Sequence, residues 1–530
     1  MPLTASELDR REFIALSSVA SVSAATAAGV IGAIHPDSAR ADTQAKLGGT
    51  LRIAMNVKAV DDPIRFDWPE KGNVARQFLE GLVRWNADLT FAPQLLEGWI
   101  VSDDSRTYTL QVRRGVTWTN GDAFTADDVI HNIRRWCDTT IEGSVTPGQF
   151  AALVDAGTGQ LRAGAVERVD DHTVVLHLQS PDVTLIPAMS TLNALCVHPR
   201  FDGSAALSEA PIGTGAFELE SLELGIKARC VRRRDGKWWG GAAYLDAVEF
   251  IDLGSDASLQ VASFEANEID MNMSTSADFI EVLDAQGLDS QTKSTANTIL
   301  ARMRVDEPPY DDQRVRQAIQ MAVDNRVVLE LGFGGRGLVA ENHHCGPMHP
   351  EYAELPPQTH DPSRASEVMT ELGLSDTELE IISADEDWQS NTADAVAAQL
   401  RDAGLKVKRT VVPGATFWND WNKYPFSLTW WVPYPLAVSV YRLAYHSEGA
   451  WNETGFASRE FDALLDEAAG IFDAEERKVP MAKMEKILQD SGVLVQPYWT
   501  NSTQHYRTFV KNYDTHVQQE LHLEHVWIDG

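Results

Sequence analysis

Residues 379–412 constrain the fold more tightly than any other part of the sequence. Leu379–Ile382 has the pattern of a strand, Thr392–Ala403 that of a helix ending at Gly404, and Leu405–Val412 that of a second strand. A strand, a helix and a strand in this order form a βαβ unit, whose right-handed crossover makes the two strands parallel. Because parallel sheets are covered by helices, we expect a covered α/β sheet.

Other segments extend the α/β prediction along the chain. Thr50–Met55 and Tyr108–Val112 alternate apolar and polar residues, as half-buried strands do. Thr125 stands three residues before Asp128, a variant of the capping box that begins a helix. From Asp312, apolar residues at helical spacing predict one helix of about five turns. These residues are Val315, Ala318, Ile319, Ala322, Val323, Val327 and Leu331.

Length and charge narrow the class of protein. A chain of 530 residues exceeds what one hydrophobic core usually supports, so two or more lobes are expected. The formal net charge of -32 repels phosphate backbones and anionic lipid headgroups. The sequence therefore argues against nucleic-acid binding and against membrane docking through a basic patch. Solubility in a salty medium is the favoured explanation of the charge.

Residues 1–41 are interpreted as an export signal. Arg10 and Arg11 precede an Ala- and Ser-rich, weakly apolar stretch, and Ala39-Arg40-Ala41 provides a cleavage site. Paired arginines in this context resemble a twin-arginine signal; a Sec signal that carries two arginines is the alternative. No later stretch approaches the ~20 apolar residues needed to span a bilayer. We expect a periplasmic, exported protein whose mature chain begins at Asp42, without membrane insertion.

The cysteines do not select a disulfide pattern. Four cysteines allow three complete pairings, and no two have the close spacing of a zinc or redox site. The residue directly after the predicted cleavage site is Asp42 rather than a cysteine, so a lipid anchor is not expected. Buried or disulfide-linked cysteines are both compatible with the sequence; they are Cys137, Cys196, Cys230 and Cys345.

Enzyme motifs are missing from the sequence. Gly332–Gly337 matches G-x-G-x-x-G, but it follows a helical segment, whereas the dinucleotide motif follows a strand and opens a helix. The nucleophile, zinc-protease and phosphate-loop motifs do not occur. We therefore predict a binding protein without catalytic residues or cofactors. A hydrolase of unknown motif, a periplasmic chaperone and a chemoreceptor partner are the alternatives.

Three ordered segments carry a resemblance to a known family. The first runs from Glu80 through Ala92-Pro93-Gln94-Leu95-Leu96-Glu97-Gly98-Trp99 to Val129; the others are Pro211–Phe217 and Asp311–Ala318. They resemble family 5 of the bacterial extracellular solute-binding proteins. That group contains dipeptide-, oligopeptide- and nickel-binding proteins of ABC importers.

The resemblance implies a two-lobed periplasmic-binding-protein fold of the Venus-flytrap kind, type II, with an extra inserted subdomain. The ligand would be buried when the lobes close. A base of lobe I would comprise residues 42–70, 208–298 and 500–530, its inserted subdomain residues 71–207, and lobe II residues 299–499. The protein would be a monomer that passes a peptide or a related small polar compound to the permease subunits of an ABC importer with a cytoplasmic ATPase.

Aromatic residues provide the main ligand candidates. Five of the 15 tryptophans fall between Phe417 and Trp451, with tyrosines interleaved. Aromatic faces bury ligand side chains, and their polar tips supply directed hydrogen bonds. Packing inside the C-terminal lobe is the alternative role. The candidates here are Trp430, Trp431, Tyr434, Trp451 and Asn452, with Tyr498 farther along the chain.

Pro433 leaves the cargo open. It occupies the position where peptide-binding relatives are expected to carry an aspartate that binds the peptide's amino group. Proline has no charge to pair with an ammonium. A modified peptide, an opine-like conjugate, an oligosaccharide or a nickel chelate are therefore alternatives to an ordinary peptide.

Loops after predicted strands supply further candidates, because ligands of open α/β sheets collect at the carboxyl ends of strands. They are Asp67 and Trp68 after the first strand, and Asp387 and Trp388 after the first strand of the βαβ unit. The alternative interpretation of these acids is that they are solvated carboxylates of surface loops. His343, His344 and His349 are weak metal candidates, and polar loop residues are the favoured interpretation of them.

Overall fold

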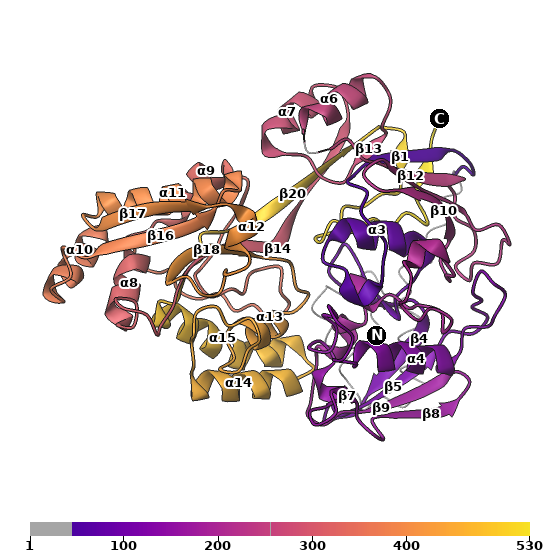
Figure 1. Cartoon of the computed structure of the whole chain (residues 1–530), viewed down its shortest axis with the longest axis horizontal. Coiled ribbons are helices and arrows are strands. Elements are labelled where there is room, and N and C mark those ends of the chain that lie inside the picture. The colour runs from indigo at the N-terminus through magenta and orange to yellow at the C-terminus, as the bar shows by residue number, and fades with distance from the viewer. Residues whose placement is uncertain (1–44, 255) are drawn as a thin grey trace, which may run out of the picture. The chain divides into compact units, whose positions relative to one another are not determined.

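The computed structural model describes residues 45–254 and 256–530, and the chain forms two compact units. Unit 1 runs to Lys293 and resumes at Ser502–Gly530; unit 2 is Ser294–Asn501. The predicted export signal and its cleavage site lie outside the described residues. The mixed α/β architecture that the sequence predicts is present in both units (Figure 1).

Unit 1 is built on a mixed sheet in the order β10-β11-β12-β1-β13-β20. β1 is parallel to β12 and β13, whereas β11 is antiparallel to both of its neighbours, β10 and β12. The helix α3 packs on β10 and β11. The bounds are Phe217–Glu223 (β10), Lys227–Arg232 (β11), Ala247–Ile251 (β12), Thr50–Ala54 (β1), Met271–Asn272 (β13), Tyr498–Tyr506 (β20) and Pro69–Phe78 (α3).

A second, antiparallel sheet of unit 1 has the order β4-β5-β9-β8. Its strands are Leu96–Val101 (β4), Thr107–Val112 (β5), Thr173–His177 (β9) and Val166–Asp170 (β8). The helix α4, Ala126–Trp136, packs against β8 and β9 and begins with the predicted capping box. Thr125 accepts a hydrogen bond from the Asp127 amide, and Asp128 accepts one from the Thr125 amide at 2.7 Å.

Shorter elements complete unit 1. Its remaining strands are Val83–Trp85 (β2), Phe91–Pro93 (β3), Val154–Asp155 (β6), Gln160–Leu161 (β7), Val510–Lys511 (β21) and Trp527–Ile528 (β22). Its remaining α-helices are Leu185–Ala188 (α5), Ser258–Glu265 (α6) and Ile280–Asp284 (α7).

Unit 2 contains the predicted βαβ unit. Its strand order is β20-β14-β18-β16-β17, with β15 paired to β20 and β19 to β14. β16 is parallel to β17 and β18, and β14 is antiparallel to β18. The crossover helix α11 begins at Asp387 rather than at Thr392. The bounds are Asp289–Met303 (β14), Gly337–Val339 (β15), Glu378–Ala384 (β16), Lys406–Val412 (β17), Phe426–Trp431 (β18), Leu494–Val495 (β19) and Asp387–Asp402 (α11).

The predicted long helix after Asp312 is wrong, because two helices occupy that segment. The first, α8, ends at Met321, and Asp324 takes extended backbone angles and caps the second, α9. Asp324 Oδ1 accepts from the Arg326 amide at 2.9 Å. Val327 and Leu331 are exposed, since the break removes them from the stripe that α8 buries. The helices of this unit are Gln313–Met321 (α8), Asn325–Phe333 (α9), Pro362–Glu371 (α10), Gly414–Phe417 (α12), Ala437–Ala444 (α13), Arg459–Gly470 (α14) and Ala474–Ser491 (α15).

The strands β14 and β20 carry the chain from one unit to the other and are joined by side-chain hydroxyls. Within unit 1, the hydroxyls of Thr292 and Thr503 lie 2.8 Å apart. Within unit 2, Ser294 Oγ donates to Asn501 Oδ1 at 2.9 Å. These polar residues explain why this part of β14 lacks the apolar pattern of a strand.

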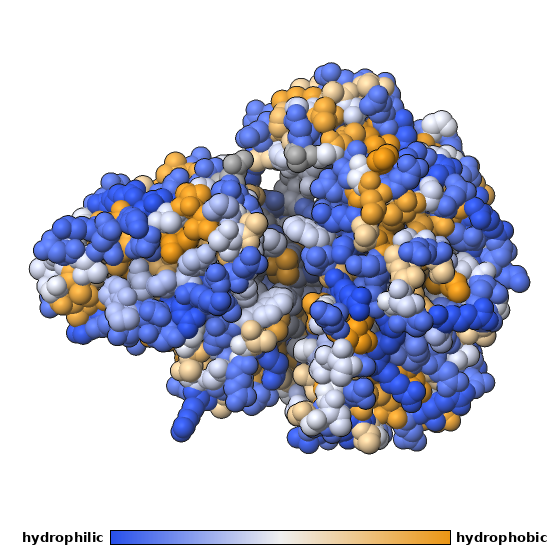
Figure 2. Space-filling view, in the orientation of Figure 1, coloured by the Kyte–Doolittle hydropathy of each residue, from blue (hydrophilic) through white to orange (hydrophobic). Residues whose placement is uncertain are grey.

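The surface fits the acidic composition. Hydrophilic residues cover most of the face shown in Figure 2, in keeping with 77 acidic and 45 basic residues. The four cysteines are free and buried. Across residues 45–254 and 256–530, none of the helices has the length and apolar character that crossing a membrane requires.

Candidate functional site

Most of the sequence-predicted ligand residues lie in unit 2. Its parallel strands β16, β17 and β18 share one carboxyl edge, where Asp385–Glu386, Pro413 and Val432–Tyr434 follow them. The helix α11 also begins at this edge. Ligands of open α/β sheets bind at such edges, so the loops here are the first place to look for a site in unit 2.

The two adjacent tryptophans at the end of β18 point to opposite faces of the sheet. Trp430 packs in the core that contains α8, α9 and α11, and Trp431 in the core that contains α13, α14 and α15. Side chains alternate along a strand, so adjacent residues cannot share a face. Each tryptophan therefore anchors a separate aromatic cluster.

The Trp430 cluster consists of Trp388, Trp418, Trp430 and Phe333. The ring centroids of Trp430 lie 6.4 Å from Trp388 and 5.7 Å from Trp418, and Phe333 lies 6.0 Å from Trp388. At these separations the rings pack directly against one another, so they do not face one another across a gap that a ligand could fill. The Trp430 indole nitrogen is buried and has no hydrogen-bond partner among the described residues.

The Trp431 cluster consists of Trp431, Trp451, His344 and Tyr445. Trp431 is 4% exposed, and the 40% exposed Trp451 ring packs on it with centroids 5.8 Å apart. His344 meets Trp431 edge-on at 5.3 Å and shares a 2.8 Å hydrogen bond with the Tyr445 hydroxyl. Burial lowers the pKa of His344 well below its ordinary value, so this imidazole is neutral.

A buried ion pair supports the Trp431 cluster. Glu453 Oε1 accepts from Trp431 Nε1 at 2.8 Å and from Thr429 Oγ1 at 2.9 Å. Glu453 Oε2 accepts from Arg302 Nε at 3.2 Å, and both charged side chains are almost fully buried. Burial raises the pKa of Glu453, and Arg302 opposes that rise. One sequence signal points to Arg302, an arginine within the apolar run of β14, but none points to Glu453.

Three further candidates already make contacts within the protein. Asn452 donates to the carbonyls of His446 and Phe456, at 3.2 and 2.7 Å, and thereby closes its own loop. The Tyr498 ring is fully buried, and its hydroxyl lies 2.6 Å from Thr392 Oγ1. Tyr434 is partly buried and packs against the core around Trp431. The side chain of Asp387 lies outside the described residues.

Asp67 and Trp68 belong to unit 1, where they precede α3. Asp67 pairs with Lys71 at 2.9 Å, and the Lys58 ammonium lies 4.7 Å from the Trp68 ring centroid. Trp68 is 45% exposed. A half-exposed indole beside two lysines and an acid can receive a polar ligand, with the ring supplying contact area.

The histidine candidates lie in the 341–349 loop, as interpreted from the sequence, and they are buried there. His343, His344 and His349 lie inside unit 2 with exposures of 0%, 1% and 4%. His343 Nε2 lies 3.2 Å from Glu341 Oε2, and His349 Nδ1 accepts from the Gly346 amide at 3.0 Å. These contacts fix the 341–349 loop.

A different group comes closest to a metal site among the residues that the structure describes. His516, Glu520 and His522, in unit 1, bring ligand atoms within 4.8 Å of one another. Glu520 is held by both terminal nitrogens of Arg76 at 2.9 Å, and His516 Nδ1 accepts from the Gln518 amide at 3.2 Å. A metal would have to displace or share these bonds, so the group is better explained as polar packing of the C-terminal segment on α3.

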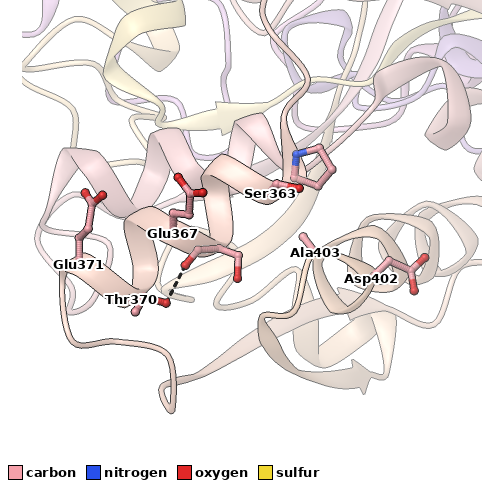
Figure 3. A pocket seen from close by; sticks show the side chains of 8 residues that line it. Ser363, Glu367, Thr370, Glu371, Asp402 and Ala403 are labelled. Atoms are coloured by element: carbon pink, nitrogen blue, oxygen red, sulfur yellow. Dashed lines mark hydrogen bonds between the residues drawn. The ribbon is translucent and has the colours of Figure 1, made fainter.

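An open hollow of about 610 Å³ lies between α10 and the end of α11 (Figure 3), and none of its lining residues belongs to either aromatic cluster. Its acids are Glu367, Glu371 and Asp402. Arg364 pairs with Glu367 at 3.0 Å and with Glu371 at 2.8 Å. Because the hollow is shallow and its glutamates are already paired, it offers a ligand little buried contact.

Comparisons with known proteins agree on one family. The family model described as "Bacterial extracellular solute-binding proteins, family 5 Middle" matches residues 90–452. The "Probable peptide ABC transporter periplasmic-binding protein y4tO" of Sinorhizobium fredii is 26% identical over 70% of this chain and 72% of its own length. The dipeptide-binding protein DppE of Bacillus subtilis is 23% identical over 92% of this chain and 93% of its own.

Solved structures share the fold. The substrate-binding protein CtaP from Listeria monocytogenes has a TM-score of 0.81 at 18% identity, covering 92% of this chain and all of its own. AppA from Bacillus subtilis, in complex with a nonapeptide, has a TM-score of 0.75 at 18% identity over 92% and 100%. AgaA from A. tumefaciens R10, in complex with agropinic acid, has a TM-score of 0.75 at 20% identity over 91% and 99%. The predicted fold class is confirmed, and because the family model matches more than half of the chain, this protein belongs to the bacterial extracellular solute-binding proteins of family 5.

Proposed function

We propose that this protein is an exported, periplasmic substrate-binding protein that delivers a short peptide or a related small polar compound to an ABC importer. Support comes from the family match, which spans the candidate residues from Trp388 to Asn452. The relatives y4tO and DppE carry peptide-transport and dipeptide-binding names. The permease and ATPase would act as partners, and the binding protein would return its ligand unchanged.

One observation carries the ligand site. The exposed Trp451 ring rests on the buried Trp431 at the end of β18, which leaves an aromatic surface at the carboxyl edge of the sheet. An exposed tryptophan that is backed by a fixed ring offers contact area with little loss of side-chain freedom on binding. We assign the ligand's apolar or planar part to this surface.

The ligand's amino group needs a different receptor from the one expected in peptide-binding relatives. Pro433 stands at the expected aspartate position, and Glu453 is occupied by Arg302, Thr429 and Trp431. An opine-like ligand without a free amino terminus is therefore the second candidate cargo. The agropinic acid complex of AgaA shows that this fold accepts such a compound.

A thermal-shift screen of residues 42–530 separates the two cargoes. The panel would contain di- and tripeptides, their N-acetylated forms and agropinic acid. A ligand at 100 times its Kd should stabilise the folded protein by about 2.7 kcal/mol. Stabilisation by free peptides supports peptide cargo, and stabilisation by blocked peptides or agropinic acid alone supports the second candidate. Mass spectrometry of recovered ligand would reveal any hydrolysis, which would contradict a purely binding role.

A further inference from the structure

The loop from Trp451 to Glu453 makes two contacts with Trp431, one with its ring and one with its indole N–H. Trp451 packs its exposed ring on the Trp431 ring, with centroids 5.8 Å apart. Two residues later, Glu453 accepts the Trp431 indole N–H at 2.8 Å inside the protein. One short segment therefore sets both the ring that meets solvent and the orientation of the ring beneath it.

The register of β14 and β18 explains why a carboxylate is needed at this point. Arg302, Thr429 and Trp431 point to the same sheet face, since Ser427 is opposite Arg302 and Leu300 is opposite Thr429. Arg302 is fully buried, and an unpaired buried charge is strongly unfavourable. Glu453 neutralises that charge and has lone pairs left for the hydroxyl and the indole on the same face.

The guanidinium of Arg302 extends the same support to a neighbouring loop. Its two terminal nitrogens donate to the main-chain carbonyls of Trp421 and Tyr424. Arg304, two residues along β14, donates to the Asn422 carbonyl at 2.6 Å. The ion pair thus joins β14, β18, the 421–424 loop and the loop that carries Trp451.

We propose that Glu453 is a positioning residue for the ligand site: it binds the Trp431 indole N–H inside the protein and so fixes the Trp431 ring as the support on which the exposed Trp451 ring packs. This inference rests on the proposed function and specifies it. The part of the ligand that packs on this pair is an apolar or aromatic side chain, or a planar group that needs no hydrogen bond from the protein. Trp430 provides the contrast, because its indole nitrogen has no such partner.

Two double variants isolate the indole contact from the ion pair. Arg302→Met with Glu453→Gln removes both charges and leaves an acceptor oxygen for Trp431. Arg302→Met with Glu453→Leu removes the acceptor as well. Because both variants lack the ion pair, a difference between them reports the N–H···O contact and not the loss of buried charge.

The first measurement uses ligand-free protein. Proton–nitrogen spectra of tryptophan-labelled protein, assigned with Trp431→Phe, follow hydrogen exchange at the Trp431 indole. We expect slow exchange in the wild type and the Gln variant, and faster exchange in the Leu variant. Equal protection in the two variants would overturn the proposal, and this test stands even if the cargo is misidentified.

The second measurement is calorimetric titration with alanyl-phenylalanyl-alanine and alanyl-glycyl-alanine. The Leu variant should bind the phenylalanine peptide about tenfold more weakly than the Gln variant, and the glycine peptide should show a smaller difference. Equal affinities in the two variants would reduce Glu453 to a purely structural residue. If the wild type binds neither these peptides nor agropinic acid, the proposed function fails instead.

Trp431→Phe covers the case in which neither double variant folds. It keeps an aromatic ring and the Arg302–Glu453 pair but lacks the indole N–H. We expect a folded protein with weaker binding of alanyl-phenylalanyl-alanine, because the ring is no longer oriented by Glu453. Wild-type affinity in this variant would refute the positioning role.

Discussion

Glu485 lies wholly inside unit 2, where burial raises its pKa to about 7. Its neighbours include the imidazole of His343, the thiol of Cys345 and the carboxylate of Glu341. The Ala353 amide donates to Glu485 Oε1 at 3.3 Å. Because the folded protein holds this proton to a higher pH than an unfolded glutamate does, the residue couples stability to pH.

The coupling gives a prediction for Glu485→Gln. An unfolded glutamate loses its proton near pH 4.5, so wild-type stability should fall as pH rises from about 4.5 to about 7. Glutamine does not titrate and should remove this fall. Urea unfolding of both proteins at pH 5 and pH 8 measures the effect. From pH 5 to pH 8 the unfolding free energy of the wild type should fall by roughly 2–3 kcal/mol more than that of Glu485→Gln. An identical pH dependence would show that Glu485 is already ionised in the folded protein.

The backbone of Phe78 lies so close to residue 213 that only glycine fits at this position. A β-carbon at this position would stand 1.7 Å from the Phe78 carbonyl oxygen, whereas one at Gly148 would meet nothing within 4 Å. Gly213→Ala should therefore destabilise the protein by about 1–3 kcal/mol or more, and Gly148→Ala should change it by less than about 0.5 kcal/mol. Thermal unfolding of the pair checks this; equal midpoints would mean that the Phe78 segment moves aside freely.

The ligand candidates were only partly predictable from sequence. The density of tryptophans marked the stretch that supplies most of the rings of both aromatic clusters, and strand alternation alone could have placed Trp430 and Trp431 on opposite faces. Glu453 could not be identified, because its role depends on Arg302, which lies 151 residues away in the sequence and meets Glu453 only in the folded protein. Asn452 and Tyr498 have internal partners that sequence reasoning does not show.

At the scale of elements, the break between α8 and α9 shows how two helices can imitate one. The apolar spacing continues through residues 315–331, but the first helix ends at Met321 and Asp324 caps the next. Periodicity alone does not reveal such a break, because the spacing of apolar residues is preserved across it. The acid before Asn325 was the available signal, since aspartate is a preferred helix cap.

The same break can be tested by mutation. Asp324→Ala removes the acceptor for the Arg326 amide and should cost about 1 kcal/mol of unfolding free energy. Asp324→Asn keeps an acceptor and should stay close to the wild type. Chemical denaturation measures both. If alanine is as stable as asparagine, the helix start is set by packing rather than by the cap.

The elements that several independent sequence signals predicted together were confirmed. The βαβ unit combined strand composition, helix periodicity and a glycine stop, and β16, α11 and β17 follow it with a parallel register. The capping box at Thr125 forms as expected. The polar part of β14 was not predicted, because its partners are polar side chains on β20 more than 200 residues later.

At the scale of the whole molecule, the family resemblance supplied what local patterns could not. Periodicity indicated an α/β chain of more than one lobe, while the ordered segments around residues 80–129, 211–217 and 311–318 pointed to the family that the comparisons then showed. The specific cargo depends on single positions such as Pro433, where this chain departs from the expected pattern.

Calorimetric titration of the wild type and Trp451→Ala with the tightest ligand from the thermal-shift screen tests whether the Trp431–Trp451 pair forms the ligand site. We expect the wild type to bind one ligand per chain and Trp451→Ala to bind it about tenfold more weakly. Val479→Ala, on an exposed face of α15, serves as the control and should bind like the wild type. Equal affinity in Trp451→Ala and Val479→Ala would contradict the assigned site, and a wild type that binds no peptide or opine-like compound would contradict the proposed function.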